Sequence, residues 1–345
     1  MNAAIERKVE LVQLRRPYLL FLGDAPDALS VKTARGIAVW RPDDCLGQLR
    51  LAGCAADVGL ADVGLEQAAE QGAKTLVIGV AARGGRIPPS WAPTLLRALE
   101  LKFDIASGLH ERLVDVDGLE RAAHAAGLRL TDVRHPEGPF EIASGKPRSG
   151  KRMLTVGTDC SAGKMFTALA VEREMRKRGL DVDFRATGQT GILIAGSGIC
   201  LDGVISDFVA GAAEALSPAN NPDHWDVIEG QASVLHPSYG GVTLGLVHGS
   251  QPDKMVLCHP ATRQHMRGLG QRPLPDLGDC MAAHEAAARL TNPGAKVVGL
   301  SLNTQDLPER DMHALLAALE HQYGLPAADP MRTGVARLVD ALLDD

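Results

Sequence analysis

The chain has 345 residues, of which 45% are hydrophobic and 3% are aromatic, and 42 Asp and Glu outnumber 36 Lys and Arg to give a net charge of −6. This length exceeds one ordinary hydrophobic core and predicts two domains. Basic residues scattered within an acidic total exclude a general nucleic-acid binder, so we expect small-molecule substrates and no nucleic acid as partners.

Cysteine spacing and hydropathy indicate the cellular compartment of the protein. The six cysteines are Cys45, Cys54, Cys160, Cys200, Cys258 and Cys280, and no two of them form a Cys-x-x-Cys pair. This spacing predicts neither a zinc site nor a disulfide framework, and no metal site is expected. The N-terminus has no apolar signal core, and no window is long and uncharged enough to span a bilayer. We therefore expect a cytoplasmic protein with no membrane partner.

In the first 140 residues, short apolar runs alternate with helical stretches, which predicts a parallel sheet. We expect strands at 18–22, 37–40, 74–80, 103–106 and 129–133. Helices at 66–71 and 119–126, each followed by a glycine and then a strand, are typical of a doubly wound fold. Asp24, Arg83 and His110 follow expected strands, where open α/β sheets bind ligands, but no Gly-x-Gly-x-x-Gly supports an NAD site.

A glycine-bounded loop follows the apolar strand expected at 153–156. It reads Gly157, Thr158, Asp159, Cys160, Ser161, Ala162, Gly163, Lys164 and Met165. Inward backbone N–H groups, the N-terminus of the next helix and the lysine form a phosphate cradle. The common P-loop has four residues between its glycines and then Gly-Lys-Ser/Thr, whereas here five intervene and Met165 replaces the hydroxyl that ligates Mg²⁺. The loop is predicted to hold a phosphorylated ligand but to be poorly equipped to cleave it, unless the hydroxyl of Thr158 or Thr167 substitutes.

The remaining sequence completes a second α/β domain. Further strands are expected at 182–186, 226–228, 242–247, 254–258 and 296–302, and helices at 165–178, 311–323 and 334–343. The fold class is therefore α/β, with a Rossmann-like parallel-sheet domain over 1–140, a Pro/Gly/Ser-rich linker over 141–152 and a P-loop NTPase-like domain over 153–345. The leucine-rich C-terminal helix could pack against a neighbour, which makes a homo-oligomer the expectation, or cover its own sheet.

Polar residues at further strand ends and helix starts supply candidate ligand contacts. Arg185, Thr187 and Gln189 follow the second strand of this domain, and Asn303 ends a later strand with an amide suited to an adenine edge. Glu229 ends the third strand, where P-loop proteins place a metal or water partner, and Asp207 opens a helix. Together Asp207 and Glu229 could also hold a metal.

These motifs carry two resemblances. The longer loop and the Glu229-Gly230 strand end resemble the dethiobiotin-synthetase and cobyric-acid-synthase branch of P-loop proteins. Nearly the whole chain resembles a two-domain family long catalogued only as a domain of unknown function, whose characterised branch is similar to a D-glutamate N-acetyltransferase. The motifs of that resemblance are Gly23-Asp24-Ala25-Pro26, Gly157-Thr158-Asp159-Cys160, Ala186-Thr187-Gly188-Gln189-Thr190-Gly191, Asp207-Phe208-Val209, Ile228-Glu229-Gly230-Gln231 and Ser301-Leu302-Asn303-Thr304.

The resemblance implies acetyl transfer from acetyl-CoA to the amino group of D-glutamate or a related D-amino acid, and the chirality comes from it alone. The phosphates and adenine of CoA could use the loop and Asn303 without metal-assisted cleavage. The alternatives are an ATP- or GTP-dependent ligase or kinase with Mg²⁺, of the dethiobiotin-synthetase type, and a nucleotide-binding regulator without turnover.

Acetyl transfer requires a base, an oxyanion site and carboxylate binding. Glu229 is the first candidate base and His236 the second, and Asp207 is a further catalytic candidate. Glu229 could instead be a metal ligand or a helix cap, and His236 could simply be exposed to solvent. Gly240 and Gly241 could face an oxyanion or simply form a turn, and Cys160 could carry a transient acetyl group. Arginine is the usual partner of a substrate carboxylate, and the candidates are Arg83, Arg134, Arg185 and Arg263. Each of them could instead form a surface ion pair.

Overall fold

The computed structural model describes residues 11–81 and 83–344, without the side chain of Arg83. Contacts divide the chain into two compact units. The P-loop unit comprises Gly138–Thr187 and Val204–Asp345, and the N-terminal unit comprises the described residues up to Glu137 together with Gly188–Gly203. The boundaries expected from the sequence do not anticipate that Gly188–Gly203 packs with the N-terminal residues.

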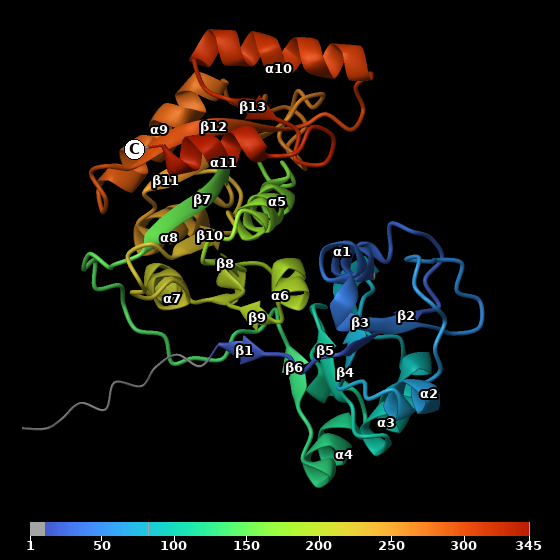
Figure 1. Ribbon diagram of the computed structural model, residues 1–345. Coiled ribbons are helices and arrows are strands. Elements are labelled where there is room, and N and C mark those ends of the chain that lie inside the picture. The colour runs from blue at the N-terminus through green and yellow to red at the C-terminus, as the bar shows by residue number, and fades with distance from the viewer. Residues whose placement is uncertain (1–10, 82, 345) are drawn as a thin grey trace, which may run out of the picture. The chain divides into compact units, whose positions relative to one another are not determined.

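The N-terminal unit is built on a five-stranded parallel sheet in the order β3-β2-β4-β5-β6 (Figure 1). In chain order its strands are β2 Tyr18–Gly23, β3 Cys45–Arg50, β4 Thr75–Ile78, β5 Asp104–Ser107 and β6 Leu130–Asp132. Its helices are α1 Lys32–Trp40, α2 Leu65–Glu70, α3 Ala92–Glu100, α4 Leu119–Ala126 and α6 Gln189–Ala195, and β1 Val12–Gln13 pairs with β9 Ser197–Gly198. Strand β2, the first of this sheet in the chain, lies between β3 and β4, which is the flavodoxin-like doubly wound order.

One strand predicted for this unit was wrong, and one strand was not predicted. The run 37–40 is the last part of helix α1 and not a strand, because Ala34, Ile37 and Trp40 recur every third residue and are all buried on one helix face. The strand that takes its place in the sheet is β3, which the sequence analysis missed. It is an edge strand whose apolar residues are interrupted by Gln48 and Arg50, so it lacks a continuous hydrophobic run.

The P-loop unit is built on a six-stranded parallel sheet in the order β13-β12-β11-β7-β10-β8. In chain order its strands are β7 Lys151–Gly157, β8 Val182–Arg185, β10 Trp225–Ile228, β11 Lys254–Pro260, β12 Lys296–Asn303 and β13 Ala327–Ala328. Strand β7 lies between β10 and β11 and is buried from Arg152 to Gly157, so the loop that follows it emerges from the middle of the sheet. Loops after β10 and β11 therefore flank the P-loop.

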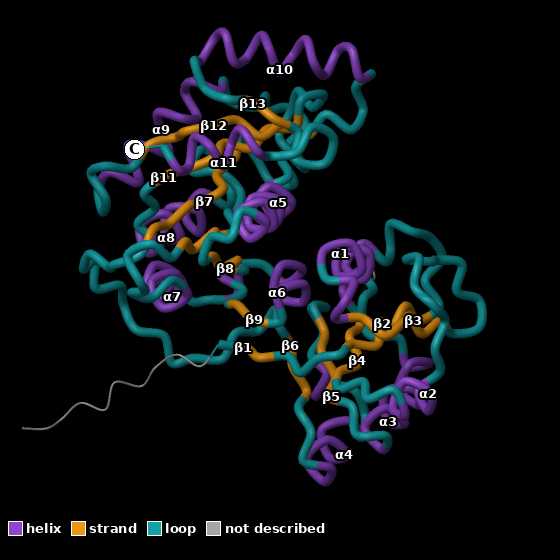
Figure 2. Tube along the Cα trace, viewed as in Figure 1, coloured by secondary structure: helices purple, strands orange, loops and turns teal. Residues whose placement is uncertain are grey.

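Helices cover both faces of this sheet, and the strand and helix alternation is clear along the chain (Figure 2). The helices are α5 Lys164–Lys177, α7 Val209–Leu216, α8 Gly240–Ser250, α9 Leu277–Arg289, α10 Glu309–Tyr323 and α11 Ala336–Leu343. Helices α5 and α11 pack together on one face, and α8 packs between α7 and α9 on the other.

The run 242–247, predicted as a strand, lies inside helix α8. Glycines in this helix allow α7 to approach closely, because a Cβ on Gly245 would lie 2.7 Å from Val209 Cγ1 and one on Gly249 only 1.9 Å from the backbone oxygen of Ala210. Valines and glycines are poor helix formers, so tertiary packing stabilises this helix against its local preference.

The C-terminal helix α11 buries Leu338, Val339 and Leu342 against β12, β13 and α5 of its own unit. Helix α11 thus covers the sheet of its own unit. Among the described residues, no helix is both long and apolar enough to cross a membrane.

Candidate functional site

The P-loop joins β7 to α5 in a cradle that needs its glycines. Ser161 and Gly163 adopt left-handed φ angles of 52° and 102°, and α5 begins at Lys164. Gly163 suits this conformation because it has no Cβ. The Lys164 ammonium donates to the carbonyl oxygens of Asp159 at 2.7 Å and Ala232 at 2.8 Å. Burial lowers the pKa of Lys164, so an anion that entered the cradle would stabilise its charged form.

Asp159 is the centre of this site and is fully buried. Its Oδ2 accepts from the backbone N–H of Arg267 at 2.7 Å and pairs with Arg263 Nη2 at 2.8 Å. The same Arg263 nitrogen donates to the carbonyl oxygen of Cys160 at 2.8 Å, and the Arg267 guanidinium donates to the Ser161 hydroxyl. The loop after β11 therefore braces the P-loop through two basic residues.

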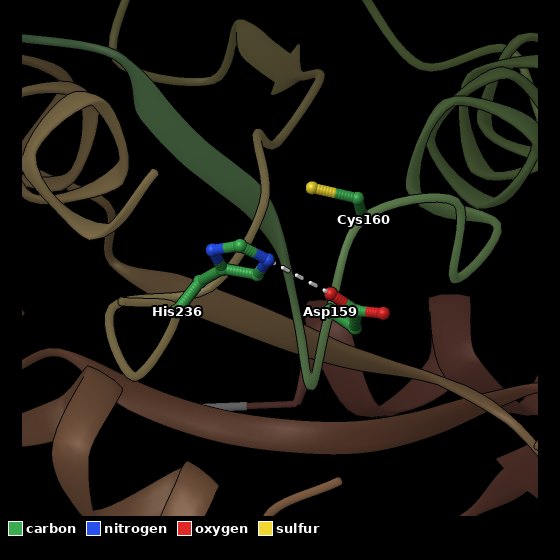
Figure 3. A group of neighbouring side chains, drawn as sticks. All are labelled: Asp159, Cys160 and His236. Carbon is green, nitrogen blue, oxygen red and sulfur yellow. Dashed lines mark ion pairs between the residues drawn. The ribbon is translucent and has the colours of Figure 1, made fainter. Parts of the chain in front are cut away.

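His236 faces the other carboxylate oxygen of Asp159, with 3.4 Å between Nε2 and Oδ1 (Figure 3). Its Nδ1 accepts from the backbone N–H groups of Ser238 at 3.1 Å and Tyr239 at 3.2 Å, and the ring stacks on Tyr239. Because Nδ1 is an acceptor, neutral His236 carries its proton on Nε2. The geometry favours a hydrogen-bond donor at this position over a base.

Cys160 completes a group of three potential metal ligands with Asp159 and His236, whose ligand atoms lie within 4.8 Å of one another. The donor set does not fit a resident metal, because Nε2 of His236 holds a proton that two backbone N–H groups on Nδ1 keep there. Burial raises the pKa of the Cys160 thiol, which disfavours the thiolate needed for an acetyl-cysteine.

Glu229 directly follows β10, the strand next to β7, and is buried. Its Oε2 accepts from the backbone N–H of Thr187 at 3.0 Å, and the Thr187 hydroxyl donates to the Glu229 carbonyl oxygen at 2.7 Å. The next residue, Gly230, donates its N–H to the Thr155 hydroxyl at 2.8 Å, and its Cβ position lies 3.0 Å from Lys164 Cδ. Glu229 is thus held just after the strand next to β7, and its neighbour Gly230 lies against Lys164.

The hydroxyls considered as substitutes for the missing P-loop Ser/Thr contact other groups of the protein. Thr158 Oγ1 lies 3.0 Å from His259 Nδ1, and Thr167 Oγ1 donates to the Gly163 carbonyl at 3.1 Å and lies 2.7 Å from Ser301 Oγ. Asn303 ends β12, where its Oδ1 accepts from the backbone N–H of Gln305 at 3.2 Å.

Several residues predicted from the sequence lie elsewhere. Arg185 pairs with Asp226 at 2.6 Å and Asp183 at 3.2 Å, in a group that includes buried His224. Asp207 is exposed in the 3₁₀ turn Ser206–Phe208.

Other candidates belong to the N-terminal unit and not to the unit that contains the P-loop. Arg83 and Gln189 are among them, and the side chain of Arg83 lies outside the described residues. Arg134 donates to the Gly108 carbonyl at 3.3 Å, and Asp24 accepts from the Trp91 indole at 2.9 Å.

Sequence reasoning missed two contributors. Arg267 lies in a loop whose only signal is a second basic residue four positions after Arg263. His284 lies behind the P-loop on α9, a helix that was not predicted, where its Nδ1 donates to the Cys280 carbonyl at 2.8 Å and its Nε2 accepts from Val234 N–H at 3.4 Å. The Cys280 sulfur lies 3.6 Å from the Gly157 carbonyl oxygen, so α9 supports the start of the loop.

Comparisons with known proteins cover nearly the whole chain. A model described as domain of unknown function DUF1611, P-loop domain, matches residues 141–339, and one described as DUF1611, Rossmann-like domain, matches residues 49–136. A D-glutamate N-acetyltransferase of Tritonibacter scottomollicae is 55% identical over 95% of this chain and 99% of its own, and one of a Pseudoalteromonas species is 47% identical with the same coverage. The crystal structure of a DUF1611 family protein from Anabaena variabilis is 31% identical, with a TM-score of 0.81 over 96% of this chain and 100% of its own.

Proposed function

This chain belongs to the DUF1611 family, and from that premise we propose that it is a D-glutamate N-acetyltransferase that takes its acetyl group from acetyl-CoA. The observation that carries the proposal is the 55% identity, over 95% of this chain, to an enzyme of that name. The family models and the structure of the Anabaena variabilis relative establish the family and its two-domain α/β fold. That the acetyl donor is acetyl-CoA is our own inference. It rests on the chemistry of the P-loop.

The residues of the loop fit the phosphates of CoA. Nε of Arg263 is a buried donor without a hydrogen-bond partner among the described residues, and Nε2 of His236 faces only the Asp159 carboxylate, at 3.4 Å. Lys164 is the first residue of helix α5. A buried guanidinium N–H without a partner beside a helix N-terminus favours an anion, and the buried Asp159 carboxylate, whose Oδ1 accepts no hydrogen bond among the described residues, is the negative charge already present there. Lys164, Arg263 and the loop N–H groups would hold phosphate, and Asn303 the adenine. Bound acetyl-CoA would supply the acetyl group as an activated thioester.

The transfer forms a C–N bond between the substrate amine and the acetyl carbon, and breaks the C–S bond of the thioester. The amine must lose a proton, for which we propose Glu229 as base. We propose His236 as the donor to the developing oxyanion, because its proton is fixed on Nε2 by the two N–H groups on Nδ1. The first ammonium proton passes through Glu229 to solvent. The CoA thiolate leaves and takes up the second nitrogen proton, so the products are the amide and the free thiol.

The ATP- or GTP-dependent ligase is less well supported by these side chains. Met165 offers no oxygen ligand at the first helical turn, and the hydroxyls of Thr158 and Thr167 contact His259, Gly163 and Ser301. Cytoplasmic location and homo-oligomerisation stay predictions from the sequence. Light scattering of the purified protein tests the second.

The deciding experiment incubates the purified protein with acetyl-CoA and D-glutamate, with L-glutamate as the matched control. We expect N-acetyl-D-glutamate by chiral mass-spectrometric analysis, with one CoA thiol released per product. Parallel reactions replace acetyl-CoA by ATP-Mg²⁺ or GTP-Mg²⁺ and measure phosphate. Phosphate release without acetylation would contradict the proposal and favour the ligase.

A further inference from the structure

A largely apolar groove of about 800 Å³ lies in the P-loop unit. One wall is formed by Leu235 and Pro237, and the other by the loop 266–275, in which Met266, Leu269 and Leu274 face the groove. The second wall is an ordered loop, because Met266 N–H donates to the Arg272 carbonyl at 2.8 Å and Leu274 N–H donates to the Gln264 carbonyl at 2.9 Å. This size is in the range of small-molecule sites.

Both walls are attached to the same residue of the P-loop. His236, which lies between Leu235 and Pro237 in the chain, faces Asp159 Oδ1 at 3.4 Å. Arg267, which follows Met266, donates its backbone N–H to Asp159 Oδ2 at 2.7 Å. Each wall of the groove is therefore next in the chain to a residue that contacts Asp159 of the P-loop. A molecule with phosphate at one end and a less polar chain at the other could occupy both the cradle and the groove.

We propose that this groove binds the pantetheine arm of the acyl donor, an inference that rests on the proposed function. In CoA the arm is attached directly to the pyrophosphate, so it must leave the cradle at the phosphate end. Its geminal methyl groups and methylenes suit leucine, methionine and proline surfaces, and its two amides suit a groove with polar residues such as Gln271 and Arg272. The arm would then lie against the wall formed by Leu235 and Pro237, which flank His236, the proposed oxyanion donor.

The test compares CoA with adenosine 3′,5′-bisphosphate, which keeps the adenine and phosphate but lacks pantetheine. Calorimetric titration of Leu269→Asp should show a dissociation constant for CoA at least about tenfold weaker than wild type, because the charge must be desolvated against the arm, with the bisphosphate within about twofold. Leu290→Asp, at a leucine that is 75% exposed after α9 and outside the groove, is the matched control and should change neither constant. Lys164→Ala should weaken both ligands.

Hydrogen exchange of the wild-type protein gives a second readout that needs no variant. CoA should protect backbone amides in 266–275 beyond the protection given by the bisphosphate. Equal weakening of both ligands by Leu269→Asp, or no difference in protection, would overturn the groove while leaving the donor intact. Failure of the wild-type protein to bind CoA at all would overturn the donor and this inference together.

Discussion

Replacing Gly230 by alanine should severely destabilise the P-loop unit. A Cβ at this position would lie 1.6 Å from the backbone oxygen of Thr155 in β7, whereas real Cβ contacts stay beyond 3.0 Å. The ends of β10 and β7 must therefore separate by about 1.4 Å, the difference between these two distances. The obstacle is backbone, so no change of rotamer can relieve it.

Overpacking by one methylene commonly costs about 1–3 kcal/mol even where side chains can move. We expect Gly230→Ala to lower the free energy of unfolding by at least about 3 kcal/mol, and the melting temperature by roughly 6–12 °C for a unit of this size. The same shift moves Thr155, two residues before the P-loop, so affinity for acetyl-CoA should fall as well.

The assay is urea unfolding followed by circular dichroism, with calorimetric titration of acetyl-CoA. Gly241→Ala is the matched control, because its Cβ would meet no atom within 4 Å and it lies in the first turn of α8. That variant should be neutral or slightly more stable, since alanine is the better helix former. A free energy of unfolding for Gly230→Ala within about 0.5 kcal/mol of wild type would refute the steric argument.

Two further predictions concern groups around the site. Burial lowers the pKa of His284 to about 4, whereas its pKa in the unfolded chain is about 6.5. As the pH falls, the unfolded state therefore binds a proton before the folded state does. The contribution of this group to the free energy of unfolding should be complete above pH 6.5 and fall by at most about 3 kcal/mol as the pH drops to 4. His284→Asn should flatten that pH dependence in denaturant titrations, and an unchanged slope would contradict it. Arg185→Gln should destabilise by about 2–3 kcal/mol, because it leaves buried Asp226 without its closest cation, yet keep KM for D-glutamate within about twofold. A tenfold rise in KM would instead return Arg185 to the substrate site.

The sheets were predictable where strands are continuous apolar runs. The core of the P-loop sheet, at 153–156, 254–258 and 296–302, has this pattern because helices cover both faces. Helix α8 was not predictable, because its glycines serve contacts with α7 that no local pattern reveals. A short apolar run such as 37–40 fits a strand and a helix equally well until its neighbours are known.

In the candidate site, too, some features were predictable from the sequence and others were not. The loop between β7 and α5 was predictable from local spacing, since glycines and a lysine define it within nine residues. The bracing of Asp159 by Arg267 was not, because the two residues are 108 positions apart and meet only through the loop after β11. Likewise the tautomer of His236 depends on how the chain turns at Ser238 and Tyr239, which composition does not determine.

The assignment of Gly188–Gly203 to the N-terminal unit has a consequence during translation. Leu14 N–H donates to the Gly196 carbonyl at 2.8 Å, and Gly36 on α1 packs against Ile194 of α6. A nascent chain that ends at residue 140 therefore lacks both partners. The N-terminal unit can be completed only after residue 203 has left the ribosome, when β7, α5 and β8 of the other unit have already emerged. Cutting the gene at the linker would consequently yield one fragment missing a helix and another carrying that helix without its sheet.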